Sequence, residues 1–592
     1  MCGIVGYIGR DKCIPNIING LERLEYRGYD SAGIAYIKNN KINIKKVTGK
    51  IINLKNKVNL EEDSFIGIGH TRWATHGKPS DINAHPHQVG KITIVHNGII
   101  ENYEELKLKL NDYQFKSETD TEVLAALLDK LYKKYNDMVV VLNELPKHVI
   151  GSYAVGILVE GDNKLYTIRK DSPLIIGTSD NGNFIASDVP AILKYTNKYY
   201  LLDNDEYAVI NENDVIIYNK GKIITKKINT YDGDINSAMK NGYDHYMLKE
   251  IHEQPKVIMD TVSEYINNID KLNKTFSFID KYDNIDIVAC GSSYHVGILG
   301  KYLITKYSNI NVNTEIASEY RYTNHNYSKK HLIILISQSG ETADSLAVLR
   351  NAKENNIDTL AIVNVISSSI AREANRVIYT KAGPEISVAT TKAYSCQFMV
   401  LSLISLYLGL KNKLLDLDVI KEYKKIEEYT NIALKDDEIK EIAKIIHNKK
   451  DIFYIGRKLD YALCMEASLK LKEISYLHSE AYAAGELKHG TISLIEQDTP
   501  VISIITDDNI RLKTLSNVKE TCARGAFSII ISNEKVEDKS IYNKLIIVPK
   551  TIDLIEPVLV IIKCQLLAYY IAKLNGCDID QPKNLAKSVT VE

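Results

Sequence analysis

One pattern occurs twice in the second half of this chain and constrains its fold more than any other feature. A short strand with buried-type residues at 285–289 ends at Cys290-Gly291-Ser292-Ser293, and a second at 452–455 ends at Gly456-Arg457; each leads into a helical pattern. Two further strands follow in each copy at nearly the same spacing, at 332–336 and 359–363 and at 501–505 and 526–531. Because strands that alternate with helices form parallel sheets, the repetition predicts two tandem α/β domains of similar topology.

The N-terminal part of the chain has a different rhythm. Strand-like runs at 64–68, 92–95 and 151–159 alternate with Gly, Asn and Asp turns, and helical patterns intervene at 101–110 and 121–135. This predicts a mainly β domain with a few helices.

A polar segment separates the two parts. It is rich in Asn, Asp and Lys, and we expect a linker there with some helix, for example over 245–266. The predicted division is an N-terminal domain, a linker, two α/β domains and a C-terminal tail, at residues 2–212, 213–275, 276–415, 442–582 and 583–592.

Composition excludes several classes of protein. At 592 residues the chain has room for about three or four domains, and its formal net charge of −1 implies no nucleic acid partner. The eight cysteines form no C-x-x-C pair, and no zinc-finger spacing occurs, so neither a disulfide scaffold nor a metal site is expected. The N-terminus does not have the pattern of a signal peptide. The apolar stretches 398–408 and 555–567 are too short or too interrupted for the roughly 18–20 residues of a membrane span, so we expect a cytoplasmic protein.

The second residue is a cysteine, which becomes N-terminal if Met1 is removed. Cys2 would then carry a thiol nucleophile beside its own α-amine, whose unperturbed pKa of roughly 7.7–8 suits a general base. This is the arrangement of N-terminal nucleophiles. The alternative is an ordinary buried thiol that happens to follow Met1.

Other residues of the N-terminal domain fit the same chemistry. Arg72 is suited to a bidentate grip on a carboxylate, and Asn97 followed by the Gly98 backbone N–H can form an oxyanion hole for acyl transfer. Asp120 can bind an α-ammonium group, although a helix N-cap is the alternative. Together with Cys2, these residues describe hydrolysis of the side-chain amide of a free amino acid.

Two serine-rich turns follow neighbouring strands of the first α/β domain. Ser292-Ser293 and Ser337-Gln338-Ser339-Gly340-Glu341-Thr342 each stand between a strand and a helix, where backbone N–H groups attract an anion. They suit a phosphate held mainly by neutral donors, and helix capping by serine is the alternative.

A further group of polar residues lies in the second α/β domain. Lys470 and Glu473 share one helix face, and a carboxylate beside a lysine can abstract a proton next to a carbonyl. His489, in a Gly-flanked loop, can act as an acid or base on a ring oxygen. The alternatives are a surface ion pair and a plain loop histidine.

These motifs carry a resemblance that covers the whole chain. Cys2–Gly6, Arg27–Ser31, Thr71–Gly77 and His96–Asn102 resemble the class II glutamine amidotransferase domain. The segments Ser337–Asp344, Glu473–Gly490 and Asp580–Glu592 resemble the glucosamine-6-phosphate synthase family, the isomerizing glutamine–fructose-6-phosphate aminotransferases, of the compact bacterial type.

The resemblance implies a fold and a reaction. The fold is an α+β N-terminal-nucleophile sandwich followed by two tandem sugar isomerase (SIS) domains with parallel sheets. The reaction transfers the amide nitrogen of L-glutamine to D-fructose 6-phosphate and isomerises the product to D-glucosamine 6-phosphate, the first step of the hexosamine pathway. The resemblance further implies a homodimer with no metal, no organic cofactor, no nucleic acid and no membrane partner.

The resemblance also assigns roles to residues. Cys2 attacks the amide, Asn97 and Gly98 form the oxyanion hole, Trp73 gates an ammonia channel, and glutamine is held by Arg72, Trp73, Thr75, His76 and Asp120. Glu473 moves a proton between C1 and C2 beside Lys470. His489 of the neighbouring subunit opens the sugar ring, and Lys587, in a tail folded over the sugar site, forms a Schiff base. The sugar phosphate contacts are Ser292, Ser293, Ser337, Gln338, Ser339, Thr342, Val388, Thr390 and Ala586.

Small departures from the family pattern do not put the reaction in doubt. Thr390 stands where the family commonly has Ser, and Thr491 replaces a common Pro. The chain also lacks the long insertions of feedback-regulated forms, so inhibition by a nucleotide sugar is not expected. Two other interpretations stay open: a sugar-phosphate deaminase or an amidotransferase for another ketose phosphate, and a sugar-phosphate sensor without catalysis.

Overall fold

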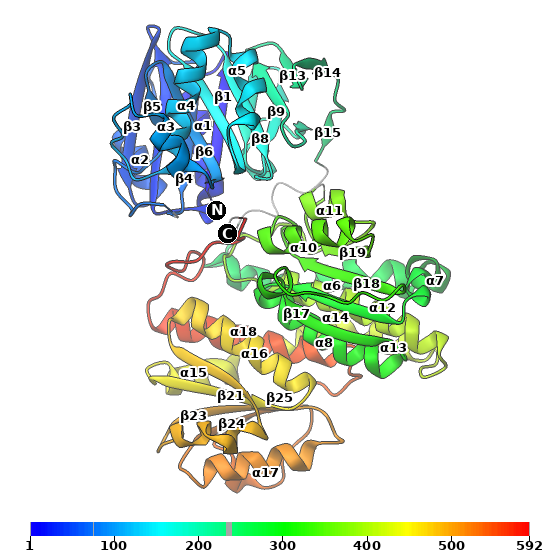
Figure 1. Cartoon of the computed structure of the whole chain (residues 1–592). Coiled ribbons are helices and arrows are strands. Elements are labelled where there is room, and N and C mark those ends of the chain that lie inside the picture. Colours follow the sequence, from blue (N-terminus) through cyan, green and yellow to red (C-terminus); the bar gives the residue numbers. More distant parts are fainter. Residues whose placement is uncertain (1, 75, 232–239, 367, 591–592) are drawn as a thin grey trace. The chain divides into compact units, whose positions relative to one another are not determined.

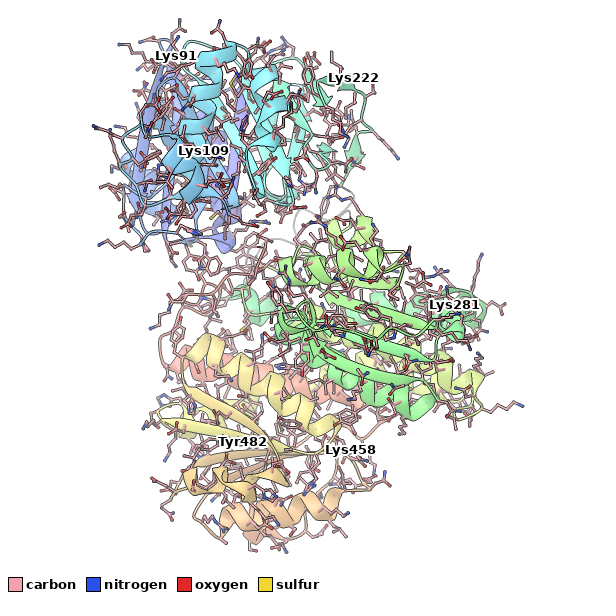
Figure 2. All side chains as sticks on the ribbon, viewed as in Figure 1. Lys91, Lys109, Lys222, Lys281, Lys458 and Tyr482 are labelled. Carbon is pink, nitrogen blue, oxygen red and sulfur yellow. The ribbon has the colours of Figure 1, made fainter. Side chains whose placement is uncertain are left out.

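The computed structural model describes residues 2–590 except 75, 232–239 and 367 (Figure 1). The chain forms two compact units. The first comprises Met1–Ala238 with Ala586–Glu592, and the second comprises Met239–Leu585. Exposed lysines such as Lys91, Lys222 and Lys281 line the surfaces of both units (Figure 2).

The first unit contains two antiparallel sheets. The eight-stranded sheet has the order β15-β11-β9-β10-β1-β4-β2-β3, and the seven-stranded sheet has the order β14-β13-β12-β8-β7-β6-β5. The strands are β1 (Gly3–Gly9), β2 (Ser31–Lys38), β3 (Lys41–Thr48), β4 (Ile66–Arg72), β5 (His87–Val89), β6 (Ile92–Ile100), β7 (Gly151–Val159), β8 (Leu165–Lys170), β9 (Ile175–Ser179), β10 (Gly182–Ala186), β11 (Lys198–Leu201), β12 (Tyr207–Ile210), β13 (Val215–Asn219), β14 (Lys222–Ile224) and β15 (Asn229–Thr230).

Alternation along β1 explains how these sheets pack. Ile4 and Ile8 belong to a core cluster that also contains Val95 and Ala154 of the other sheet, so the two sheets face each other. Val5 points the opposite way, into a cluster with the helix α1 (Cys13–Leu24). The outer face of the second sheet is covered by α4 (Asp120–Tyr135). Three shorter helices complete the unit: α2 (Ile51–Lys57), α3 (Tyr103–Lys109) and α5 (Met138–Glu144).

The structure differs from the sequence prediction at the start of the segment expected as a linker. Residues 215–230 form the strands β13, β14 and β15, which extend both sheets of the first unit. The prediction missed them because they are short edge strands with many Asn and Lys residues, and edge strands need no continuous apolar run. The later part of the segment forms α6 (Tyr246–Ile266) and α7 (Ile269–Phe276), which pack into the core of the second unit.

The second unit contains two five-stranded sheets with the same parallel topology, which confirms the predicted fold class. Their orders are β17-β16-β18-β19-β20 and β22-β21-β23-β24-β25. The first set is β16 (Asn284–Ala289), β17 (Asn311–Ile316), β18 (His331–Ser337), β19 (Asp358–Val363) and β20 (Arg376–Tyr379). The second set is β21 (Asp451–Gly456), β22 (His478–Ala483), β23 (Pro500–Ile505), β24 (Phe527–Ser532) and β25 (Lys544–Ile547). We call these two regions the first and the second repeat.

Helices cover both faces of each sheet (Figure 1). In the first repeat, α8 (Gly291–Tyr307) and α12 (Lys392–Lys411) pack on one face and α10 (Ala343–Glu354) on the other. In the second repeat, α16 (Leu459–Ser475) and α18 (Glu556–Leu574) pack on one face and α17 (Arg511–Cys522) on the other. Short helices complete the unit: α9 (Ala317–Tyr320), α11 (Ser369–Glu373), α13 (Val419–Tyr423), α14 (Ile426–Ala433) and α15 (Asp437–Ile446).

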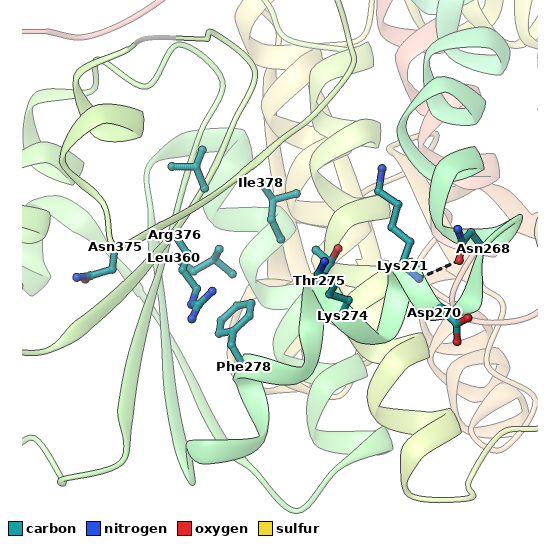
Figure 3. Close-up of a pocket in the computed structure, with 11 residues that line it drawn as sticks. Asn268, Asp270, Lys271, Lys274, Thr275, Phe278, Leu360, Asn375, Arg376 and Ile378 are labelled. Carbon is teal, nitrogen blue, oxygen red and sulfur yellow. Dashed lines mark hydrogen bonds between the residues drawn. The ribbon is translucent and has the colours of Figure 1, made fainter.

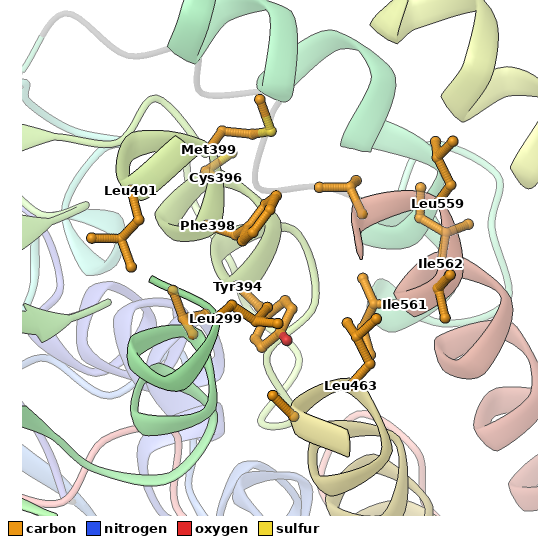
Figure 4. Packing of buried hydrophobic residues seen from close by; sticks show 14 of the residues in the cluster. Leu299, Tyr394, Cys396, Phe398, Met399, Leu401, Leu463, Leu559, Ile561 and Ile562 are labelled. Atoms are coloured by element: carbon orange, nitrogen blue, oxygen red, sulfur yellow. The ribbon is translucent and has the colours of Figure 1, made fainter. Parts of the chain in front are cut away.

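The two repeats share one hydrophobic core. Figure 4 shows Leu299 of α8, Tyr394 of α12, Leu463 of α16 and Ile562 of α18 in this core. Contrary to the sequence prediction, α12 and α18 are long and apolar enough to cross a membrane, but 94% and 83% of their most apolar windows are buried inside the protein. They are therefore core helices of this unit.

Candidate functional site

The first candidate site forms where Cys2 meets the end of β4. Pairing of β1 with β4 places Gly3 opposite Thr71, so Cys2 lies beside the residues that follow this strand. The Trp73 N–H donates to Cys2 Sγ at 3.3 Å. Burial raises the pKa of the Cys2 thiol, against the opposing effects of the Trp73 N–H and the Arg72 guanidinium. A thiol with a raised pKa needs a base to become nucleophilic, and the α-amine freed by removal of Met1 would stand on the same residue.

Asn97 reaches Cys2 from the opposite sheet. Its Nδ2 donates to the Cys2 backbone carbonyl at 2.8 Å and to Ser187 Oγ at 2.9 Å. Ser187 Oγ also accepts from the Ile4 N–H at 2.8 Å, which ties the start of β1 to the same network. Gly98 has a φ of 128°, and a Cβ there would lie 2.0 Å from the Ser152 carbonyl oxygen, so this position requires glycine. The structure thus brings Cys2, Asn97 and Gly98 together.

Arg72 and Asp120 are buried charged residues of the first unit. Arg72 is 3% exposed; its Nη2 donates to the Gly77 carbonyl at 2.9 Å, and its Nη1 has no hydrogen-bond partner among the described residues. Asp120 is 5% exposed and accepts the Ile100 N–H at 2.9 Å. Thr119, not Asp120, caps α4, so the capping alternative does not account for this carboxylate. A buried guanidinium with a free donor and a buried carboxylate suit the two charged ends of an amino acid.

The other residues predicted to contact glutamine are His76, Trp73 and Thr75. The His76 ring lies edge-on to Tyr103 with centroids 5.5 Å apart, and its Nδ1 is buried without a partner among the described residues. Trp73 is half-buried. Thr75 lies outside the described residues.

Three residues that the sequence did not single out support this site. Asp30 accepts the Ala74 N–H at 2.8 Å and fixes the loop after β4. His70 Nε2 donates to Asn97 Oδ1 at 3.0 Å, which orients the Asn97 amide so that its nitrogen faces Cys2. Burial lowers the pKa of His70 to about 3, so the ring is neutral. Ser187 is the third. In the sequence, Asp30 lies within the Arg27–Ser31 motif and His70 directly precedes the Thr71–Gly77 motif, whereas Ser187 belongs to no motif.

The second candidate site begins at the two serine-rich turns. The strands β16 and β18 are parallel neighbours. The two strands that follow β16 in the chain, β17 and β18, lie on opposite sides of it. Open α/β sheets bind ligands at such a switch point. Ser292 and Ser293 begin α8 at one strand end, and the turn 337–342 precedes α10 at the other.

Hydrogen bonds within the turn 337–342 hold its hydroxyls together. Ser337 Oγ and Thr342 Oγ1 are 2.8 Å apart, and Ser337 Oγ accepts the Gly340 N–H at 3.0 Å. No serine side chain caps either helix, because Cys290 precedes α8 and Thr342 makes no capping bond to α10. The helix-capping alternative therefore does not account for these serines. Gln338 and Ser339 are half-buried in the same turn.

Two other predicted sugar contacts lie in the loop that precedes α12. The Val388 N–H donates to the Asp580 carbonyl at 3.0 Å, and Thr390 Oγ1 donates to Glu385 Oε2 at 2.5 Å. Ala586 and Lys587 belong to the C-terminal segment that groups with the first unit.

Lys470 and Glu473 lie on α16 and are not a surface ion pair. Lys470 is 1% exposed and donates to Glu473 Oε2, while its Nζ is also 3.5 Å from Oε1 of the fully buried Glu466. Burial alone would lower the pKa of Lys470, but the two carboxylates outweigh this and raise it. A buried row of carboxylate, ammonium and carboxylate is typical of an active site. His489, by contrast, is exposed and has no hydrogen-bond partner within the described part of the chain.

A surface pocket lies elsewhere in the second unit. Figure 3 shows it beside α7 and β20, lined by residues that include Lys271, Phe278 and Arg376. Leu360 and Arg376 stand near the amino ends of β19 and β20, whereas the serine-rich turns stand at carboxyl ends. The pocket contains no predicted site residue, and within the described residues no three His, Cys, Asp or Glu side chains form a metal-binding group.

Comparison with family models gives three matches. A glutamine amidotransferase domain model matches residues 70–194, and a SIS domain model matches residues 278–406 and 445–572. The first match covers Asn97 and Asp120, and the other two cover the parallel sheets of the two repeats.

Full-length relatives share a single name. Proteins called glutamine–fructose-6-phosphate aminotransferase [isomerizing] from Caldanaerobacter subterraneus subsp. tengcongensis and Clostridium tetani are each 48% identical, over 610 and 613 residues, and cover 100% of both chains. One from Methanosarcina mazei is 45% identical over 619 residues. Among solved structures, the C-terminal domain of glucosamine-fructose-6-phosphate aminotransferase from Francisella tularensis matches with a TM-score of 0.54 and 38% identity, covering 58% of this chain and 99% of that chain.

Proposed function

The chain belongs to the family of isomerizing glutamine–fructose-6-phosphate aminotransferases, and we propose that the two groups of residues described above carry the two halves of its reaction. The protein transfers the amide nitrogen of glutamine to fructose 6-phosphate and produces glucosamine 6-phosphate and glutamate. The observation that carries the assignment of residues is the hydrogen bond from Asn97 to Cys2, which joins two sheets of the first unit next to a buried thiol.

In the first half of the reaction, the α-amine of Cys2 takes the thiol proton and Sγ attacks the amide carbon of glutamine. The negative charge that develops on the amide oxygen is stabilised by the Gly98 N–H and by Asn97 Nδ2. The Asn97 hydrogen that otherwise bonds to the Cys2 carbonyl is the one available for this purpose. Ammonia leaves, and water hydrolyses the thioester to give glutamate. Arg72 and Asp120 hold the substrate carboxylate and ammonium groups, with Trp73, Thr75 and His76 beside them.

In the second half, the sugar phosphate is held by the two serine-rich turns, together with Val388, Thr390 and Ala586. His489 of a neighbouring subunit opens the sugar ring, and Lys587 forms a Schiff base with the open-chain ketose. Ammonia displaces Lys587 and gives the fructosimine. Glu473 then removes a proton from C1 and returns it to C2, with Lys470 as its electrostatic partner. Side chains supply every step, so we propose that no metal or organic cofactor takes part.

Ammonia must pass between the two sites without contact with bulk water. Near pH 7 free ammonia in water is mostly ammonium, which is not a nucleophile. A dry conduit keeps it reactive, and we propose that Trp73 gates this conduit. We further infer that the protein is a cytoplasmic homodimer. The exposed, unpartnered His489 supports the dimer, and the free thiols of all eight cysteines support a reducing compartment.

A direct assay tests the assignment. With fructose 6-phosphate and glutamine, the protein should form glucosamine 6-phosphate, and glutamate without amino sugar would contradict the synthase activity. Cys2→Ala should abolish glutamine use and leave sugar-phosphate isomerisation largely intact, because Cys2 belongs to the first unit, whereas Glu473 and the serine-rich turns belong to the second. Loss of both activities would contradict the assignment.

Subunit mixing tests the role of His489. Glu473→Gln and His489→Ala homodimers should each be inactive. A mixture that exchanges subunits should regain about a quarter of the wild-type rate, because half of the dimers are then mixed and each has one intact site. No recovery after proven exchange would place His489 in its own subunit's site.

A further inference from the structure

A histidine of the first repeat contacts the row of charges that contains Glu473. His295 lies one turn into α8, the helix that begins at Ser292 and Ser293. Its Nδ1 is 2.8 Å from Oε2 of Glu466 on α16, and the two side chains are 12% and 0% exposed. The contact thus connects the helix of a phosphate-binding turn to the helix of the proposed base, across the junction of the two repeats.

The surrounding charges explain why this contact matters. Lys470 lies between Glu466 and Glu473, so one ammonium group serves two carboxylates. Glu466 and Lys470 are almost completely buried, so they are shielded from bulk solvent. A buried carboxylate without its own donor would compete with Glu473 for Lys470.

The direction of the hydrogen bond follows from the chemistry of the pair. Glu466 forms an ion pair with the Lys470 ammonium, and an ionised carboxylate only accepts hydrogen bonds. Nδ1 of His295 therefore carries the hydrogen and donates it to Glu466 Oε2. The Tyr394 hydroxyl is buried and has no hydrogen-bond partner among the described residues. Burial raises the pKa of Tyr394, and the nearby Glu466 carboxylate raises it further. His295 is thus the hydrogen-bond donor that the described structure provides to this carboxylate, whose Oε1 has only the ion-pair contact with Lys470.

We propose that His295 is a positioning residue for the sugar isomerisation. By satisfying Glu466, it leaves Lys470 bound to Glu473 and holds the base in place for the transfer between C1 and C2. Without His295, Lys470 moves toward Glu466 and away from Glu473. The inference rests on the proposed role of Glu473 and goes beyond it, because it assigns a residue of the first repeat to the chemistry of the second.

The test measures the full-length protein with fructose 6-phosphate and glutamine. His295→Leu removes the donor, and we expect kcat for glucosamine 6-phosphate formation to fall by about 10- to 100-fold, the usual cost of a misplaced catalytic group. The KM for fructose 6-phosphate should stay within about threefold, and glutamine hydrolysis should not change. His295→Asn keeps an N–H donor near the position of Nδ1 and should recover most of kcat.

The chain offers a matched control. His331 is also largely buried and paired with a carboxylate, with Nε2 at 2.8 Å from Asp286 Oδ2, but it lies at the start of β18, away from α16. His331→Leu should therefore leave kcat unchanged even if it costs similar stability. A second control places His295→Leu in a Glu466→Gln background, where it should cause no further loss because its partner is already altered.

Each result decides between the alternatives. Equal kcat for the two leucine variants, a rise in KM in place of a fall in kcat, or a full additional loss in the Glu466→Gln background would overturn the inference. If the His295→Leu protein does not fold, the test uses His295→Asn, alone and in the Glu466→Gln background. If the wild-type protein makes no glucosamine 6-phosphate, the proposed function fails, and that outcome is distinct from failure of the inference.

Discussion

The two repeats of the second unit have the same sheet order but differ at the carboxyl ends of their strands. In the first repeat, the turns after β16 and β18 carry Ser, Gln and Thr side chains and no carboxylate in contact with the Ser337 hydroxyl. In the second, the turn after β23 is bound by a buried carboxylate, because the Thr506 N–H and hydroxyl both donate to Asp460. One repeat presents hydroxyl groups at this turn, and the other presents a buried carboxylate.

The second repeat uses its scaffold differently. Its helix α16 carries the charged row that ends at Glu473, whereas the equivalent helix α8 carries serines at its N-terminus. Under the proposed assignment, the same architecture supplies a phosphate cradle in one copy and a base in the other. The difference teaches that topology alone assigns neither role, because the side chains at equivalent strand ends decide which ligand each sheet can take.

The largest expected effect on activity comes from removal of the proposed base, Glu473, in the second repeat. Glu473→Gln should lower kcat for sugar isomerisation by roughly 10²- to 10⁴-fold, the usual contribution of a general base, and leave glutamine hydrolysis intact. Separate assays of glutamate and glucosamine 6-phosphate measure the two effects. Lys472→Gln, an exposed neighbour on the same helix, is the control and should be neutral. An active Glu473→Gln enzyme would remove the catalytic role from the second repeat.

A smaller effect concerns the pH dependence of the second repeat. Burial raises the pKa of Asp460 to about 6 and that of Glu556 to about 7. At a pH between the ordinary carboxyl pKa and these raised values, the folded state therefore binds more protons than the unfolded state. Stability of this repeat should therefore be greatest in weak acid and fall as the pH rises to about 7, by up to about 3 kcal/mol for Glu556.

Hydrogen exchange of β23 and β24 at pH 5 and pH 7 measures this effect. Glu556→Gln should remove most of the pH-dependent loss of protection, since Gln cannot ionise. In the first repeat the sign is reversed: burial of Asp286 is outweighed by hydrogen bonds from His331 and Tyr320, which lower its pKa. The stability that the ionised Asp286 carboxylate contributes is therefore lost as the pH falls. Equal pH profiles for β18 and β23 would contradict the comparison.

The smallest expected effect comes from a single phosphate-binding hydroxyl. Ser337→Ala should raise the KM for fructose 6-phosphate roughly tenfold, since one hydrogen bond to a charged group contributes about 1.5 kcal/mol. Thr506→Val, at the equivalent turn of the second repeat, should leave KM unchanged and lower stability, because it removes the hydroxyl donor of the buried Asp460 and leaves only backbone donors. A rise in KM for Thr506→Val would show that both turns contact the sugar phosphate.

Much of the fold could be predicted from local sequence patterns. The central strands of both repeats are continuous apolar runs that end in Gly, Ser or Asn, and these signals depend only on neighbouring residues. The edge strands β17, β20, β22 and β25 were missed because one side of each faces solvent or a loop, so their sequences carry no such run. The same reason explains why the sequence predicts a linker where residues 215–230 form strands.

The candidate sites follow the same division. Local motifs pointed to Cys2, Asn97, the turn 337–342 and the pair of Lys470 and Glu473, because turn and helix geometry is set within a few residues. Contacts between distant segments left no local trace. Ser187 reaches Asn97 across the space between two sheets, and His295 reaches Glu466 across the junction of two repeats. Such contacts arise only when hydrophobic packing brings separate elements together, and the apolar residues that drive this packing do not encode which polar groups will meet.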